Sequence, residues 1–337
     1  MHVIQVGIGG MGSTWLRTVQ ASNTVTYAGL VEISPEIAAQ QAQAFNLDET
    51  RIYRTLDDAL AAIPRDEIDA VIDVTPPQFH RAIASTALHA GLPVLSEKPL
   101  AHTFDDARAL ADIARDTGTL LMVAQNYRYR PAIQTLKSVL DSGELGAIGA
   151  VSVDFYKGPH FGGFRDEMDY PLVIDMAIHH FDLMRYLLGS DAVSLFGRSW
   201  NPPWSWYKGD AAASLSLRFT NDVVVSYDGS WCAQGRETSW NGDWRFDCAG
   251  GVVTLVDDAV TVQRLTGVDG FNNRYSEPEI IAPVVMPRQG QDYLLHAFYT
   301  AVTAGTLPET TAADHIKSLA IVFRCLESFE SGAAVGF

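Results

Sequence analysis

The chain has 337 residues, which is long for a single hydrophobic core and suits two domains. Its formal net charge of −16 argues against a nucleic-acid partner or an anionic membrane surface, because phosphate groups would be repelled rather than neutralised. The first residues lack the basic, apolar and small-residue sections of a secretory signal, and no uncharged apolar run approaches membrane-spanning length. We therefore expect a cytoplasmic protein that acts on small molecules.

The chain begins with a strand-like run, 2–6, that leads directly into a glycine-rich turn. Gly7 permits the tight turn, Gly9 lets backbone N–H groups approach a pyrophosphate, and Gly12 allows the following helix to pack closely. The start of that helix offers unpaired donors and the positive end of its dipole. The pattern predicts a dinucleotide-binding turn made of Gly7, Gly9, Gly10, Met11 and Gly12.

A second strand-like run ends on Glu32, twenty residues after Gly12. A carboxylate at this distance can accept hydrogen bonds from the 2′- and 3′-hydroxyls of an adenosine ribose, and it would repel a 2′-phosphate. The sequence therefore favours NAD over NADP, although the nearby Ser34 leaves some room for both cofactors.

Strands and helices alternate over the first third of the chain. The strand-like runs of β-branched or apolar residues are 25–31, 69–75, 92–96 and 119–125, and the helical segments are 13–21, 78–90 and 104–116. Such alternation predicts a parallel, doubly wound sheet, an α/β fold.

Ligands of a doubly wound sheet bind beyond the carboxyl ends of its strands. Thr75-Pro-Pro ends one predicted strand, with His80 just inside the following helix, and Glu97-Lys98-Pro99 ends another. Each segment alone is compatible with ordinary loop residues, a proline at the start of a helix and a surface lysine. Together, around a cofactor crevice, they predict that Lys98 is directed at the nicotinamide end.

The regular alternation of strand-like and helical segments ends near residue 125. A helix is expected to start close to Pro131, and two amphipathic helices, 291–303 and 312–331, close the chain. Between them lie alternating, strand-like runs at 147–156, 212–219, 223–231, 244–248, 252–256 and 260–265. We expect a dinucleotide-binding domain over 1–124 and, over 125–337, a substrate-binding and oligomerisation domain with a mainly antiparallel sheet.

A second polar group lies in a helix that is expected over 171–188. One face of this helix carries residues at spacings of four, three and four: Asp175, His179, Asp182 and Tyr186. Histidine is the usual general base near neutral pH, and a carboxylate one turn away can orient it. Two other interpretations stay open: a capped histidine on an exposed face, and a metal site, for which no third ligand follows at a supporting spacing.

Together these motifs resemble the glucose-fructose oxidoreductase, inositol dehydrogenase and MocA (Gfo/Idh/MocA) family of pyranose and cyclitol dehydrogenases. Besides the glycine turn, the resemblance rests on Thr75-Pro-Pro with His80, Glu97-Lys98-Pro99, Asn126-Tyr-Arg-Tyr, Asp175-x-x-x-His179-x-x-Asp182 and Ser328-Phe-Glu-Ser-Gly332. It covers most of the chain. It implies an N-terminal Rossmann domain followed by an open-faced, mainly antiparallel sheet with helices on one side, a surface often used for dimer or tetramer contacts.

The resemblance also implies NAD as the cofactor, a small sugar or polyol as the substrate, and a homodimer or homotetramer. It maps the family's catalytic group onto Lys98, Asp175 and His179, and no metal is implied. The residues expected to bind NAD are Gly7, Gly9, Gly10, Met11, Gly12, Glu32, Thr75, Pro76, Pro77, His80, Glu97, Lys98 and Asn126. The residues expected to contact substrate are Lys98, Tyr127, Arg165, Asp175 and His179.

Two features depart from the family pattern and affect the expected shape of the substrate pocket, though not the chemistry. Ala177 stands where many members carry glycine, and 170–174 replaces a glycine-rich approach to the helix. Arg165 lies in a Phe-Arg-Asp segment whose simpler interpretation is a solvated turn.

The expected reaction is the reversible oxidation of a ring secondary alcohol. His179 would remove the hydroxyl proton, Lys98 would hydrogen-bond the developing alkoxide, and Asp175 would position His179 or the substrate. One alternative is an enzyme of the same fold that uses bound NAD transiently, for glycoside cleavage or epimerisation. Another is a non-catalytic sensor of nucleotide or sugar, against which the presence of all three catalytic residues argues.

Overall fold

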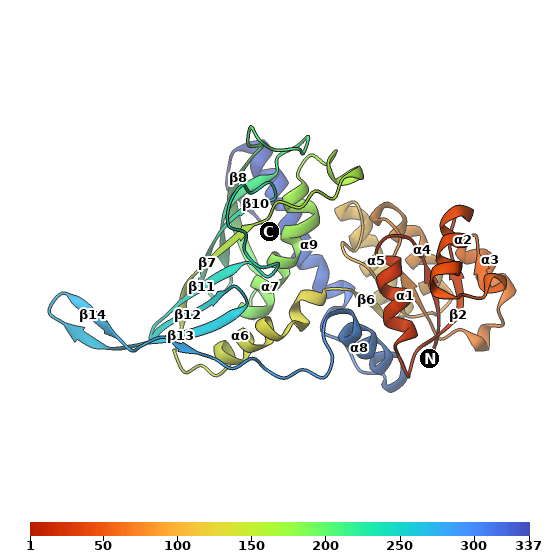
Figure 1. Ribbon diagram of the computed structural model, residues 1–337, viewed down its shortest axis with the longest axis horizontal. Coiled ribbons are helices and arrows are strands. Elements are labelled where there is room, and N and C mark those ends of the chain that lie inside the picture. Colours follow the sequence, from red (N-terminus) through yellow and green to blue (C-terminus); the bar gives the residue numbers. More distant parts are fainter. The chain divides into compact units, whose positions relative to one another are not determined.

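The computed structural model describes residues 1–337, which form two compact units (Figure 1). The N-terminal unit contains Met1–Asn126 and Arg288–Leu319, and the C-terminal unit contains Tyr127–Pro287 and Ala320–Phe337. The units are therefore interleaved in sequence, because the chain returns to the first unit before it ends in the second. The division into functional domains after residue 124 stays a prediction.

The N-terminal unit is built on a six-stranded parallel sheet in the order β3-β2-β1-β4-β5-β6. This is the strand order of a dinucleotide-binding Rossmann sheet, and the predicted doubly wound fold is confirmed. The order in which successive strands are added reverses at β1, with β2 and β3 on one side of it and β4, β5 and β6 on the other, and ligands of such sheets bind at this point. The strands are β1 His2–Val6, β2 Thr26–Val31, β3 Ile52–Tyr53, β4 Ala70–Asp73, β5 Val94–Ser96 and β6 Leu121–Val123.

Capping side chains fix where several helices of this unit begin. Thr55 starts α3 with a reciprocal capping box, accepting the N–H of Asp58 while the carboxylate of Asp58 accepts the N–H of Thr55. Ser34 accepts the N–H of Ile37 at the start of α2. The helices are α1 Gly12–Gln20, α2 Pro35–Phe45, α3 Leu56–Ala62, α4 Pro77–His89, α5 Phe104–Thr117 and α8 Gly290–Ala304, with 3-10 turns η1 Glu49–Arg51 and η2 Arg65–Glu67.

The C-terminal unit is built on a ten-stranded sheet in the order β14-β13-β12-β11-β7-β10-β9-β8-β16, with β15 beside β13. Strands β7 and β10 run parallel and all other neighbours run antiparallel. The strands are β7 Ile148–Tyr156, β8 Ala192–Trp200, β9 Ala212–Phe219, β10 Val224–Ser230, β11 Asp243–Cys248, β12 Gly251–Val256, β13 Ala259–Asp269, β14 Asn272–Tyr275, β15 Glu279–Ile280 and β16 Val335–Gly336.

Alternating burial along these strands gives the sheet one covered and one open face. In β7, the side chains of Val151, Val153 and Phe155 are buried, whereas those between them are exposed. Helices α6 and α7 lie on the covered side (Figure 1). The predicted open-faced, mainly antiparallel sheet is therefore confirmed.

The helix expected over 171–188 is irregular in its first part. Residues Leu172–Ala177 form a π-helix, η5, in which each backbone hydrogen bond reaches one residue further than in an α-helix. The helical segments of this part of the chain are η3 Asn126–Tyr129, α6 Pro131–Asp141, η4 Gly163–Arg165, η5 Leu172–Ala177, α7 Ile178–Leu188 and α9 Ala312–Ser331. No helix combines the length and apolar character that crossing a membrane requires.

A buried ion pair joins η3 to α7. Nε of Arg128 lies 2.6 Å from Oδ2 of Asp182, and Nη2 lies 2.7 Å from Oδ1, with side chains only 5% and 1% exposed. The Arg128 guanidinium also lies 5.1 Å from the centre of the Tyr186 ring, whose hydroxyl accepts a hydrogen bond from Gln134 of α6. Asp182 and Tyr186, expected on the same polar face as His179, therefore hold α7 against η3 and α6.

We expect Asp182→Ala to lower the free energy of unfolding by about 3–5 kcal/mol, because it removes the carboxylate that pairs with the buried Arg128 guanidinium. Urea denaturation measures this difference. The control is Asp112→Ala, which removes an exposed i,i+3 pair with Arg115 and should leave the free energy of unfolding nearly unchanged. Equal, small losses in the two variants would contradict a structural role for the buried pair.

Candidate functional site

The turn after β1 is so closely packed that two of its positions exclude any side chain. A Cβ atom on Gly12 would lie 2.5 Å from the carbonyl oxygen of Gly7, and one on Gly7 would lie 2.9 Å from the carbonyl oxygen of Val74. Gly7 also has a φ of +86°, which residues with a side chain rarely adopt. Glycine at these positions brings the start of α1 directly against the end of β1.

The same turn leaves space where a phosphate group would bind. A Cβ atom on Gly10 would meet no atom within 4 Å, and the backbone there has a φ of +33°. No side chain caps the start of α1 at Met11, and its first turn contains no acidic residue. A helix N-terminus that lacks side-chain acceptors binds anions through its N–H groups and dipole. The turn therefore fits the pyrophosphate of a dinucleotide.

Glu32 follows β2 and is held in place by two backbone amides. Its Oε2 accepts the N–H of Ile8 at 3.2 Å, within the glycine turn, and its Oε1 accepts the N–H of Ser34 at 3.0 Å. The side chain is half-buried. Each carboxylate oxygen has a further lone pair, so the group can also accept hydrogen bonds from a ribose diol.

We expect NAD to bind at least about tenfold more tightly than NADP, a difference of about 1.4 kcal/mol, because the Glu32 carboxylate repels a 2′-phosphate. Calorimetric titration with each dinucleotide measures the ratio. Glu32→Gln should shrink the preference for NAD, whereas Glu49→Gln, at an exposed position, should leave it unchanged. Equal affinities in the wild-type protein would contradict the assignment of Glu32.

The turn after β4 is organised by a buried carboxylate. Oδ1 of Asp73 accepts the backbone N–H of Thr75 at 3.1 Å and its hydroxyl at 2.7 Å. Burial raises the pKa of Asp73. From this turn the chain passes through Pro76 into α4, of which Pro77 is the first residue and His80 a fully buried one.

Glu97 and Lys98 follow the end of β5. The Glu97 carboxylate accepts the indole N–H of Trp15 at 2.8 Å and the backbone N–H of Lys98 at 3.1 Å. Burial raises the pKa of Glu97, while these hydrogen bonds favour its ionised form. Trp15 therefore ties the Lys98 loop to α1. This role of Trp15 could not be predicted from the sequence, because a partner 82 residues away leaves no local pattern.

In the C-terminal unit, Arg165 and Asp175 form an ion pair. Nε of Arg165, in η4, lies 2.6 Å from Oδ2 of Asp175, in the π-helix, with side chains 33% and 15% exposed. The guanidinium carbon lies 5.1 Å from the centre of the Phe161 ring and 4.8 Å from that of Phe164, both exposed. Two residues predicted to contact substrate thus meet at one point, where they offer a donor and an acceptor.

His179 and Tyr127 also meet, as stacked rings. Their centres are 4.0 Å apart and their planes differ by 9°. The guanidinium carbon of Arg130 lies 3.3 Å from the centre of the same Tyr127 ring, so it occupies the face opposite His179. This sandwich fixes the plane of the His179 imidazole.

His180, the neighbour of His179, lies in the core. Its Nδ1 is 3.2 Å from the Tyr227 hydroxyl and its Nε2 is 3.3 Å from the carbonyl oxygen of Trp240. Burial lowers the pKa of His180 to about 3. The ring is therefore neutral at physiological pH, and both of its nitrogens form hydrogen bonds within the core.

Arg130 is linked through Asn241, in the loop before β11, to the hairpin between β12 and β13. Its Nη1 donates to Oδ1 of Asn241 at 2.9 Å, and Nδ2 of Asn241 donates to Oδ1 of Asp258 at 2.8 Å. Neither Arg130 nor Asn241 was predicted from the sequence, since they are 111 residues apart and no local pattern links them.

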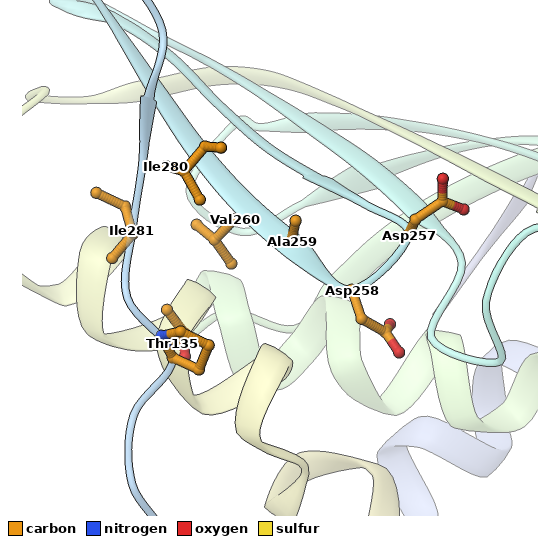
Figure 2. A pocket seen from close by; sticks show the side chains of 8 residues that line it. Thr135, Asp257, Asp258, Ala259, Val260, Ile280 and Ile281 are labelled. Carbon is orange, nitrogen blue, oxygen red and sulfur yellow. The ribbon is translucent and has the colours of Figure 1, made fainter.

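Asp258 also borders a cavity of about 150 Å³ (Figure 2). Its lining includes none of the predicted site residues and consists of Thr135, Asp257, Asp258, Ala259, Val260, Ile280, Ile281 and Pro283. No group of three or more His, Cys, Asp or Glu side chains is arranged to hold a metal ion.

Two family models match the chain. One, described as an oxidoreductase family with an NAD-binding Rossmann fold, matches residues 1–125. The other, the GFO/IDH/MocA C-terminal domain, matches residues 133–254.

Individual proteins of known name are similar over nearly the whole chain. The scyllo-inositol 2-dehydrogenase (NAD(+)) of Bacillus subtilis is 26% identical over 99% of this chain and 96% of its own. The D-apiose dehydrogenase of Paraburkholderia graminis is 26% identical over 98% and 88%. The crystal structure of an oxidoreductase from Agrobacterium radiobacter, in complex with NAD+, L-tartaric acid and magnesium, has a TM-score of 0.87 and 22% identity over 100% of this chain and 98% of that one.

Proposed function

The chain belongs to the Gfo/Idh/MocA family of oxidoreductases, which has an NAD-binding Rossmann fold, and we propose that it oxidises a ring secondary hydroxyl of a sugar, a sugar derivative or a cyclitol. The observation that carries this proposal is the Glu32 carboxylate, fixed beside an open glycine turn in a way that suits NAD. Relatives named for scyllo-inositol and D-apiose support a polyhydroxylated substrate.

NAD, when bound, supplies the hydride acceptor of the reaction. We propose that Glu32 binds the ribose diol and that the backbone amides of the glycine turn bind the pyrophosphate. The turn residues are Gly7, Gly9, Gly10, Met11 and Gly12, and the loops that complete the cofactor site contain Thr75, Pro76, Pro77, Glu97, Lys98 and Asn126.

His179 is the proposed general base, which accepts the proton of the substrate hydroxyl. Stacking on Tyr127 fixes the plane of its ring, so that the proton acceptor is oriented before substrate binds. Lys98 donates a hydrogen bond to the substrate oxygen as negative charge develops there. Arg165 and Asp175, a donor and an acceptor side by side, suit the neighbouring hydroxyls of a polyol.

We also propose a homodimer or homotetramer formed through the open face of the C-terminal sheet. Exposed apolar side chains on that face, Phe196 and Trp200 of β8 and Val224 of β10, support this assembly. Sedimentation velocity should give a species larger than the 36.8 kDa chain, and a monomer at micromolar concentration would contradict the assembly.

A screen of inositols, aldoses and glycosides for NADH fluorescence, followed by product analysis, tests the proposed reaction. A ketone product formed together with an equal amount of NADH supports it. Cleaved or epimerised product without net NADH would instead indicate transient use of the cofactor. Sugar binding without any turnover would indicate a sensor.

Lys98→Ala should lower kcat by about a hundredfold or more, because a positioned charged donor is worth roughly 3 kcal/mol to a developing oxyanion. Its Kd for NAD should change by only a few-fold. Steady-state kinetics and calorimetry measure the two effects, with Lys137→Ala of α6 as the matched control. Near-normal turnover in Lys98→Ala would remove Lys98 from the mechanism, and selective loss of NAD binding would make it a cofactor anchor.

His179→Ala should lower the oxidation rate by about two orders of magnitude and abolish the acidic limb of its pH profile. His180→Ala should mainly lower stability. The pKa of His180 is about 3, so this ring stays neutral over the pH range of an assay and cannot produce the limb. Rate profiles from pH 5 to 9 for both variants provide the measurement. Equal behaviour of the two, or loss of turnover in folded His180→Ala alone, would contradict the assignment.

A further inference from the structure

His80 lies in the first turn of α4 and joins the loops that follow β4 and β5. Its side chain is fully buried, with Nε2 2.7 Å from the carbonyl oxygen of Thr75 and Nδ1 2.9 Å from the carbonyl oxygen of Pro99. Both distances are those of hydrogen bonds, and carbonyl oxygens can only accept. Both ring nitrogens must therefore carry a proton if both contacts are to be favourable.

A neutral imidazole does not suit this position. It has one N–H and one lone pair, so one nitrogen would face a carbonyl oxygen lone pair at less than 3 Å. A 180° flip of the ring does not remove this conflict, because the partners of both nitrogens are carbonyl oxygens. The hydroxyl of Ser96 lies 3.5 Å from Nδ1, but it donates its hydrogen bond to the carbonyl oxygen of Glu97 at 3.2 Å. In a buried site, a nitrogen lone pair that faces a carbonyl oxygen, with no hydrogen bond between them, destabilises the folded state.

A buried positive charge is stabilised by carboxyl groups nearby, and Asp73 interacts electrostatically with His80. Asp73 is fully buried, and its Oδ1 accepts hydrogen bonds from Thr75, the residue whose carbonyl oxygen faces His80. Its Oδ2 has no hydrogen-bond partner. Burial raises the pKa of Asp73 and attraction to a positive His80 lowers it, while Glu97 is attracted to His80 as well.

We infer that His80 is held as an imidazolium ion and is a positioning residue for Lys98, through the carbonyl group of Pro99. Glu97, on one side of Lys98, is held by Trp15, and Pro99, on the other side, is held by His80. The backbone of Lys98 therefore lies between two anchored residues, which limits the positions that its ammonium group can reach. This role rests on the proposed function of Lys98, and it assigns His80 to the loops rather than to direct contact with NAD.

Nitrogen-15 NMR of histidine-labelled protein tests the protonation state. The chain has nine histidines, and the signals of His80 are identified by their loss in His80→Gln. We expect two protonated ring nitrogens for His80 at pH 7.5. One protonated and one unprotonated nitrogen would overturn the imidazolium assignment.

A second measurement asks whether His80 acts on Lys98. Reductive methylation with carbon-13 formaldehyde gives a separate dimethyl signal for each of the five lysines, and Lys98→Arg identifies that of Lys98. His80→Gln should shift or broaden the Lys98 signal and leave the other four in place. The control is His89→Gln, at an exposed position of the same helix, which should leave all five unchanged. An unchanged Lys98 signal in folded His80→Gln would overturn the positioning role.

Kinetics separate this role from the proposed function itself. With a polyol that the screen shows to be oxidised, His80→Gln should lower kcat about tenfold or more, while the Kd for NAD changes less than about threefold. In the Lys98→Ala background, the same change should lower kcat no further. Losses that multiply would show that His80 acts independently of Lys98. If no polyol is oxidised by the wild-type protein, the proposed function fails, whereas the two NMR results still decide the role of His80.

Discussion

Parallel strands of a doubly wound sheet end at the same edge, and the N-terminal unit depends on this constraint for its whole set of candidate groups. The glycine turn follows β1, Glu32 follows β2, and Lys98 follows β5. Residues distant in sequence are therefore gathered at one edge of the sheet. Buried polar contacts fix the loops that follow β4 and β5. These contacts are the hydrogen bond from the Trp15 indole to the Glu97 carboxylate and the contacts of the His80 ring with two carbonyl groups.

In the C-terminal unit, the environment gives neighbouring residues of one helical segment different roles. Asp182 is fully paired with Arg128 in the core, whereas Asp175 keeps some exposure in its pair with Arg165. His179 stacks on an aromatic ring, while His180 is kept neutral by burial. Burial and pairing, rather than residue type, therefore decide which of these groups is available for chemistry.

Much of the fold could be predicted from sequence because its signals are local. Glycine spacing and the alternation of strand and helix patterns identify the Rossmann sheet. Strand β8 was not predicted from the sequence, because its open face carries Phe196 and Trp200, which obscure the alternation of apolar and polar residues typical of a half-exposed strand. The π-helix, of a kind that is rare and has no distinct pattern, was also missed. The pairing of Arg130 with Asn241 depends on tertiary structure alone, and the roles of the site residues stay predictions.

The turn between β12 and β13 illustrates a compromise between backbone preference and side-chain anchoring. Asp257 and Asp258 have φ values of +48° and +63°, a region where asparagine followed by glycine is preferred in such hairpins. Yet the Asp258 carboxylate holds Asn241, which holds Arg130. Replacing the turn with its ideal sequence would relax the hairpin and release that anchor. A variant stabilised at this turn would therefore hold the Tyr127 ring, on which His179 stacks, less firmly.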